Sequence, residues 1–553
     1  MTAARRTFTR AVGQAMALAC AATATLPAQQ SAPPPAPHAD AITAARLRAD
    51  LMFLAGDGFR GRLTDTPENA LALEWVKARL EWLGLPAGGA GGSYFAPYTL
   101  MTSSLGAANE LAIDWGGATS RHAVGSDFHP RFHSASGRAT GPVAFVGYGI
   151  SAPALGHDDL AGDLRGKVLL MLDGEPGAND AASRFDGVVS SEHANQLRKT
   201  LAAQARGAAA VLFVGDVSIR AGTEQFEATT RAYWPETPMR LPRYTLASWM
   251  QQVRIPVGQL SLALAEQLVK GSGTTLQALA RAAESSTTPR VLPGVVATIS
   301  TELVRRAVAD RNVVAVLEGS DPALKDEYVL ITAHPDHNGA DGAQVFNGAD
   351  DNASGTVGLL AIADAYARAA AAGVRPKRSI LFVALNSEER GPLMGAWGYV
   401  ESPVVPLERT VAMLNMDMIG RNEEVPIGGG ARFRGLEVQT AESNRNSVNL
   451  FGFSRSRTLT AAIDRANGAI GLTLQKRYDN NASQLLRRTD MWAFLQKGVP
   501  AVTFATGLHP DYHTIYDRPE KIEYAKMERI VRLVHQVSWD LANAPDRPTL
   551  DKR

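Results

Sequence analysis

Five side chains that can bind a metal follow short apolar runs in the second half of this 553-residue chain. They are two histidines and three carboxylates: His334, Asp350, Glu389, Asp417 and His513. Zinc takes imidazole nitrogen and carboxylate oxygen as ligands, and one carboxylate can bridge two zinc ions. The set therefore predicts a site for two zinc ions per chain, with Asp350 as the bridging carboxylate.

Two neighbouring carboxylates could take part in the chemistry. Glu388 precedes the ligand Glu389 and is assigned no metal, so it could act as a general base on a water. Asp336 lies two residues after His334 and could accept the second N–H of that imidazole, which would fix its tautomer. Each residue alone is more often structural, but together and in this order they favour a catalytic metal centre.

The elements that must position these residues are four apolar runs. They lie at 328–333, 379–385, 410–414 and 501–505, and polar turns bound each of them. Near-continuous apolar runs predict strands covered on both faces, as in a parallel α/β sheet. Ligands gather at the carboxyl ends of such strands. The fold would therefore bring the predicted ligands together, with residues 348–355 adding carboxylates before a helix.

Composition excludes several classes of function. Lys and Arg number 56 against 55 Asp and Glu, and 45% of residues are hydrophobic. This balance argues against nucleic acid or an acidic membrane surface as a partner. The length indicates two or three domains. The one cysteine, Cys20, lies near the N-terminus, so the mature chain would contain no disulfide.

The N-terminal residues have the features of an export signal. Arg5 and Arg6 precede a weakly apolar stretch at 11–28 and partly match a twin-arginine signal. A Pro-rich linker follows at 29–40. We expect residues 1–28 to be cleaved, and the mature protein to be periplasmic or secreted without stable membrane association.

Six stretches of the second half resemble the dizinc aminopeptidase family of exported bacterial metallopeptidases, which is related to glutamate carboxypeptidase and the transferrin receptor. The stretches are 333–337, 347–355, 387–391, 414–421, 488–490 and 507–517. The resemblance implies that His334 and Asp417 bind one zinc ion. Glu389 and His513 would bind the other, with Asp350 between the two ions.

The resemblance also implies the catalytic roles. Glu388 would be the general base, and Tyr512 would help polarise the scissile carbonyl. A non-proline cis peptide would follow the bridging residue, between Asp350 and Asp351. The implied fold is α/β: a mixed, mostly parallel central sheet flanked by helices, as in zinc exopeptidases.

A smaller inserted α/β domain is expected to interrupt the catalytic domain. Four short stretches resemble a protease-associated domain: 143–150, 158–160, 166–168 and 205–210. The expected boundaries are 41–104 for the first part of the catalytic domain, 105–295 for the insert and 296–553 for the main part.

The leading interpretation is an exported zinc aminopeptidase that acts on peptides or proteins through a metal-activated water. A carboxypeptidase or dipeptidase would need basic residues at the substrate carboxylate, and Arg421, Arg487 and Arg488 are candidates. Glutaminyl cyclase, with one zinc ion on a related fold, and a non-catalytic binding protein on a peptidase fold are further alternatives.

Overall fold

The computed structural model describes residues 35–178, 180–215, 225–285 and 288–551. The predicted signal peptide, residues 1–28, and the first part of the predicted linker lie outside these ranges. Within the described ranges, no helix combines the length and the apolar character needed to cross a bilayer.

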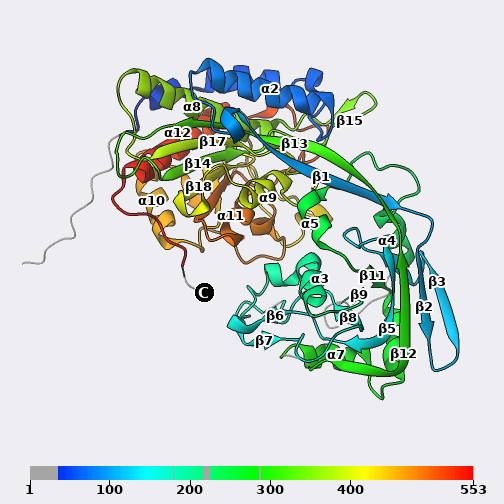
Figure 1. The fold of residues 1–553 in the computed structure, drawn as a ribbon. Coiled ribbons are helices and arrows are strands. Elements are labelled where there is room, and N and C mark those ends of the chain that lie inside the picture. The colour runs from blue at the N-terminus through cyan, green and yellow to red at the C-terminus, as the bar shows by residue number, and fades with distance from the viewer. Residues whose placement is uncertain (1–34, 179, 216–224, 286–287, 552–553) are drawn as a thin grey trace, which may run out of the picture.

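A nine-stranded mixed sheet forms the core of the larger part of the molecule (Figure 1). Its strand order is β10-β1-β13-β17-β14-β18-β21-β19-β20. The bounds are β1 (Phe95–Leu105), β10 (Thr245–Leu246), β13 (Leu303–Leu317), β14 (Tyr328–Ala333), β17 (Ser379–Ala384), β18 (Thr410–Met416), β19 (Ser447–Phe451), β20 (Thr473–Gln475) and β21 (Ala501–Ala505). The adjacent strands β17, β14, β18 and β21 are parallel and almost entirely buried. The four predicted strands and the predicted α/β class are confirmed.

Helices cover both faces of this sheet, which explains why its central strands are apolar at nearly every position. One core contains Val329 and Ile331 of β14, and the core on the other face contains Leu330 between them. The first core is closed by α1 (Ala44–Leu54), α2 (Pro67–Trp82), α8 (Gly355–Ala371), α10 (Arg457–Asn467) and α12 (Tyr524–Asn543), and the second by α9 (Met394–Glu401) and α11 (Met491–Gln496). Burial on both faces removes the polar side of the usual strand alternation.

A second sheet of eight strands lies almost entirely within the predicted insert and has its own apolar cores. Its order is β3-β2-β12-β5-β8-β9-β11-β4. The bounds are β2 (Glu110–Asp114), β3 (Thr119–Ala123), β4 (Phe128–Pro130), β5 (Gly137–Phe145), β8 (Val168–Leu172), β9 (Ala210–Val214), β11 (Val257–Leu260) and β12 (Arg290–Thr301). Its helices are α3 (Gln196–Ala205), α4 (Phe226–Tyr233), α6 (Leu262–Lys270) and α7 (Leu276–Ala283). The likeness to a protease-associated domain stays a prediction.

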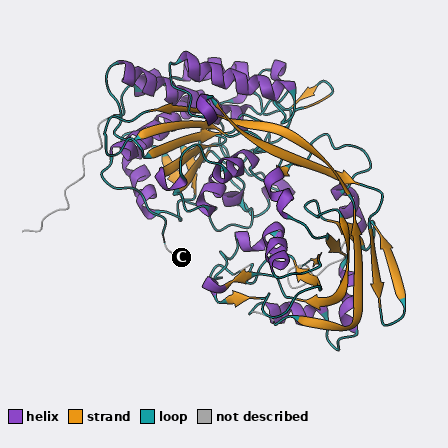
Figure 2. Cartoon of the chain, in the orientation of Figure 1, coloured by secondary structure: helices purple, strands orange, loops and turns teal. Residues whose placement is uncertain are grey.

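A long antiparallel ribbon of β1 and β13 connects the two sheets (Figures 1 and 2). It pairs from Phe95 with Val313 to Leu105 with Leu303. Strand β12 continues the second sheet to Thr301, beyond the expected boundary at residue 295. The chain also returns to the first sheet inside the insert, where Leu246 of β10 pairs with Leu100 and is followed by α5 (Ala247–Gln252). The insert therefore contacts the edge of the larger sheet. Two short hairpins complete the fold: β6 (Ser151–Ala152) with β7 (His157–Asp158), and β15 (Ala340–Asp341) with β16 (Gln344–Val345).

Candidate metal centre

The loops that leave the central parallel strands meet at one edge of the sheet. Ala333 at the end of β14 lies in register with Ala384 at the end of β17, so the two following loops begin side by side. A hydrogen bond holds the loop before α8 against β18: the Asn352 side-chain amide donates to the Met416 carbonyl at 2.9 Å. This convergence is what the strand pattern predicts.

Two clusters of metal-ligating side chains result. The first cluster is His334, Glu388 and Asp417, and the second cluster is His337, Asp351, Glu389 and His513. Within each cluster the donor atoms lie within 4.8 Å of one another. In the first cluster, His334 Nε2 is 3.4 Å from Asp417 Oδ1 and 3.9 Å from Glu388 Oε2. In the second cluster, His513 Nε2 is 3.0 Å from Glu389 Oε1.

Asp351 lies between the two clusters. Its Oδ1 is 3.5 Å from His334 Nε2 in the first cluster, and its Oδ2 is 2.9 Å from His513 Nε2 in the second. The side chain is buried. A carboxylate that presents one oxygen to each cluster has the geometry needed to bridge two metal ions.

The structure does not place Asp350, the predicted bridging residue, in either cluster, and Asp351 occupies the position between them. Asp350 Oδ1 accepts the Gly420 N–H at 2.6 Å, and its Oδ2 is 3.3 Å from His509 Nε2. The cis peptide follows Asp351, not Asp350. Asp351 has extended backbone angles, φ −105° and ψ 97°, within this irregular turn. Side chains of adjacent residues in extended backbone point in opposite directions, so only one of the two carboxylates can face the clusters.

Asp336 positions the loop that carries Glu388 and Glu389. Its carboxylate accepts the N–H of Glu388 at 3.0 Å and the N–H of Glu389 at 3.2 Å. The predicted contact with His334 is different in detail. His334 Nδ1 is 3.3 Å from the Asp336 carbonyl oxygen, whereas the Asp336 carboxylate is 3.6 Å away. The carboxylate is occupied by the two backbone donors, and the carbonyl is the nearer acceptor for the imidazole.

Glu388 is largely buried beside the first cluster. Burial raises the pKa of its carboxyl group well above the usual range, the nearby His334 lowers it, and the charges of Glu389 and Asp417 raise it further. A carboxylate with a raised pKa is a stronger base. The general-base role of Glu388 stays a prediction, and a buried carboxyl group with a raised pKa is compatible with it.

Tyr512 lies above the second cluster, with its ring stacked on His513 at 3.8 Å between centroids. Its hydroxyl accepts a hydrogen bond from Arg488 at 3.0 Å. The other candidate arginines are paired elsewhere: Arg421 with Asp511 at 2.9 Å, and Arg487 with Glu192 at 3.3 Å. Of the three, Arg488 is the one that lines the small cavity beside the clusters.

A small cavity of about 40 Å³ opens beside the clusters. Glu388, Asp417 and Arg488 contribute polar groups to its wall, and the rest is mainly apolar: Met418, Phe451, Leu485, Ala505 and Leu508. An apolar wall next to metal ligands suits a short apolar side chain of a substrate.

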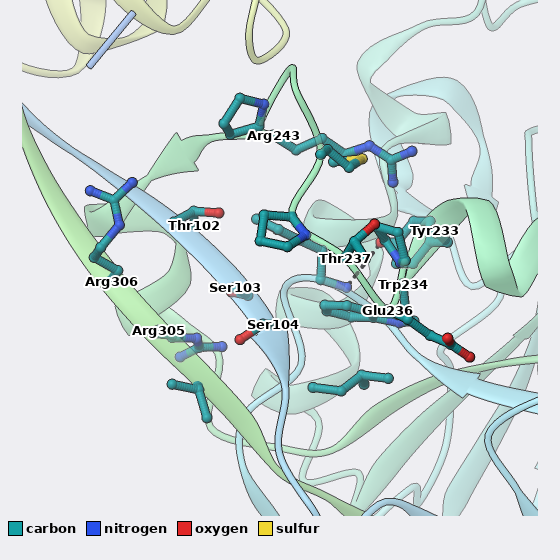
Figure 3. Close-up of a pocket in the computed structure, with 17 residues that line it drawn as sticks. Thr102, Ser103, Ser104, Tyr233, Trp234, Glu236, Thr237, Arg243, Arg305 and Arg306 are labelled. Atoms are coloured by element: carbon teal, nitrogen blue, oxygen red, sulfur yellow. Dashed lines mark hydrogen bonds between the residues drawn. The ribbon is translucent and has the colours of Figure 1, made fainter. Parts of the chain in front are cut away.

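A cavity of about 610 Å³ lies elsewhere, where the β1–β13 ribbon meets residues 233–243 of the insert (Figure 3). In Figure 3 the ribbon that carries Ser103, Ser104 and Arg305 lies on one side, and Trp234 and Thr237 of the insert lie on the other. None of the cluster residues lines this cavity. This larger cavity is therefore separate from the metal centre.

Arg62 donates hydrogen bonds to the loops that carry residues of both clusters. It was not among the site residues predicted from the sequence. It is fully buried and donates to four carbonyls: Leu54 at 3.1 Å, Pro335 at 2.7 Å, Asn347 at 2.6 Å and Gly348 at 2.9 Å. Burial lowers the pKa of its guanidinium to about 10, against the opposing effect of nearby carboxylates. Pro335 follows His334, and Gly348 precedes the turn of Asp351, so one side chain fixes both loops.

Replacing Arg62 with methionine should lower the free energy of unfolding by about 3–5 kcal/mol, because buried carbonyls lose their donors. Urea unfolding of the zinc-free variant and the zinc-free parent measures this difference. Arg60→Met is the matched control, since Arg60 is exposed and donates to the Gly342 carbonyl at 3.1 Å. The control should change stability by less than about 0.5 kcal/mol. Equal losses for both variants would contradict the assigned role.

The fold and the two clusters define a class: an α/β protein with metal-ligating side chains gathered at the carboxyl end of a mostly parallel sheet. Residues 312–538 match the model of peptidase family M28. Every residue of both clusters lies within this matched range.

Relatives are similar over parts of their length. The chain is 30% identical over 213 residues to a protein of Arabidopsis thaliana named "probable glutamate carboxypeptidase". The aligned residues cover 37% of this chain and 26% of that protein. It is 26% identical over 260 residues to a "probable zinc metalloprotease" of Pyrenophora tritici-repentis, covering 43% of this chain and 58% of that protein. The chain thus spans less than two thirds of these curated relatives.

Two solved structures align with most of this chain at low sequence identity. An aminopeptidase from Aneurinibacillus sp. strain AM-1 aligns over 93% of this chain and 98% of its own, with 17% identity and a TM-score of 0.48. An M28 peptidase precursor from Shewanella amazonensis aligns over 93% of this chain and 97% of its own, with 17% identity and a TM-score of 0.43.

Proposed function

We propose that this protein is an exported zinc exopeptidase, and that it acts as an aminopeptidase on peptides. The observation that carries the proposal is the position of Asp351, which presents one oxygen to each of two metal-ligating clusters. The match of residues 312–538 to the model of family M28 supports a peptidase. Export rests on the sequence of residues 1–28.

The residues present fit zinc. The donors are imidazole nitrogens and carboxylate oxygens, which are zinc ligands. His513 Nε2 is buried and has no hydrogen-bond partner among the described residues. A buried polar atom in that state is costly unless a further group binds it. His334, Asp417 and Asp351 would hold one ion, and Glu389 and His513 would hold the second together with Asp351. When bound, the two ions would supply Lewis acidity for a water and for the scissile carbonyl.

The protein groups around the clusters would carry out the proton transfers and the orientation. Glu388 would take a proton from the attacking water and pass it to the leaving amine. Tyr512, held by the hydrogen bond from Arg488, would donate its O–H to the substrate carbonyl oxygen as negative charge develops there. The apolar wall formed by Met418, Phe451 and neighbouring residues would receive the side chain of the terminal residue.

Arg488 favours a second candidate, a carboxypeptidase or dipeptidase. It lines the small cavity with Glu388 and Asp417 and forms no ion pair with another described residue. A guanidinium in that position could bind a substrate carboxylate. The two candidates differ in which end of the peptide must be free.

An assay on matched peptides tests both candidates. Purified protein should hydrolyse a dipeptide amide with a free N-terminus and an apolar first residue, and should leave its N-acetylated form intact. A zinc chelator should abolish hydrolysis, and added zinc should restore it, because the ligands remain in place. Cleavage of the N-acetylated peptide acid, but not of the free dipeptide amide, would favour the carboxypeptidase. No hydrolysis of any peptide by zinc-loaded protein would contradict both.

A further inference from the structure

His337 belongs to the second cluster, although the residue pattern of the sequence did not mark it as a ligand. It follows β14 by four residues and is fully buried. Its Nδ1 lies 2.9 Å from Glu389 Oε1 and 3.8 Å from Asp351 Oδ2. Its ring centroid is 5.5 Å from that of His513. The imidazole therefore borders the same space as the other members of the second cluster.

Neither ring nitrogen of His337 has a hydrogen-bond partner among the described residues. The Glu389 carboxylate lies 2.9 Å from Nδ1, close enough for an ion pair and for two ligands of one ion. A buried ring nitrogen without a hydrogen bond is costly unless another group binds it. Donors 2.0–2.1 Å from a tetrahedral zinc ion lie about 3.3 Å apart. The distance from His337 Nδ1 to Glu389 Oε1, 2.9 Å, is shorter than this value, and the distance to Asp351 Oδ2, 3.8 Å, is longer.

We propose that His337 is a fourth protein ligand of the second cluster, beside Asp351, Glu389 and His513. The proposal rests on zinc binding as given under the proposed function. Four protein ligands complete a tetrahedral zinc site, whereas three leave a position open. The second cluster would then have its four tetrahedral positions filled by the protein, and its ion would reach the scissile carbonyl only by expanding to five ligands. The first cluster would offer His334, Asp417 and Asp351, and would keep an open position beside Glu388.

The difference in the number of protein ligands gives the two ions different roles. The closed site holds its ion firmly and orders the loops of Glu389 and His513, as structural zinc sites do. The open site exchanges its ion and its non-protein ligand more readily, and Glu388 lies next to it. The competing possibility is that His337 only contacts Glu389 from outside the coordination shell.

Zinc X-ray absorption of the unmodified, fully loaded protein separates these possibilities without any substitution. With His337 bound, three imidazoles serve two zinc ions, on average about 1.5 per ion, against about 1 per ion without it. A count near 1.5 that falls in His337→Ala supports the proposal. A count near 1 in the unmodified protein overturns it. Failure to load zinc at all would instead contradict the proposed function.

Chelator titration gives a second measurement. The unmodified protein should release one ion at far lower chelator concentration than the other. His337→Ala should weaken the tighter ion by more than about 100-fold, beyond the 10–100-fold that is usual for residues outside the coordination shell. Asn338→Ala is the matched control, because the Asn338 amide donates to Glu389 Oε1 at 3.2 Å. Equal losses in His337→Ala and Asn338→Ala would overturn the proposal.

Discussion

Replacing Glu388 with glutamine should lower turnover by at least about 10²–10⁴-fold, with zinc content unchanged. Glutamine keeps the size of the side chain and one hydrogen-bonding oxygen, but it cannot take a proton. Glu388 Oε2 is 3.9 Å from His334 Nε2 and forms part of the first cluster. If it is the base and not a ligand, only the transition state loses an interaction, so kcat should fall while KM changes little.

Glu389→Gln is the comparison, because the two neighbours are assigned different roles. Glu389 contacts His513 and His337 in the second cluster at 3.0 and 2.9 Å. Its replacement should release zinc from that cluster. Steady-state kinetics together with elemental analysis distinguish the two variants. Near-normal turnover in Glu388→Gln would show that the roles are wrongly assigned, as would loss of zinc from Glu388→Gln alone.

Asp351→Asn should weaken the binding of both metal ions by more than about 100-fold, which exceeds the effect of losing a group outside the coordination shell. The reason is that its two oxygens face different clusters, so one substitution affects both ions. Turnover should be lost with the metal. Isothermal titration of the zinc-free protein with zinc measures the affinity, and elemental analysis after dialysis gives the stoichiometry.

Asp350→Asn is a close control, one residue away and equally buried. An asparagine oxygen can still accept the Gly420 N–H that Asp350 Oδ1 accepts at 2.6 Å. This variant should therefore retain two zinc ions per chain. Retention of both ions by Asp351→Asn and their loss from Asp350→Asn would restore the bridging role to Asp350, as expected from the sequence.

The sequence by itself determined the sheet and the edge at which the site forms. Apolar runs such as 328–333 and 501–505 form β14 and β21 with the predicted bounds. The polar residues that follow parallel strands converge because the strands end at one edge. His334, Glu388 and His513 are accordingly close in space, although they are far apart in the chain.

Only the tertiary structure decided which neighbouring side chain faces the clusters. Asp350 and Asp351 have the same chemistry, and the turn before α8 directs Asp351 inward and Asp350 towards Gly420. The position of His337 was also decided by the tertiary structure. It depends on how the loop after β14 packs against Arg62, which donates a hydrogen bond to the Pro335 carbonyl at 2.7 Å. Strand patterns repeat every two residues and carry no information on the backbone angles of an irregular turn. Contacts with distant residues select those angles, so adjacent carboxylates cannot be told apart until the chain has folded.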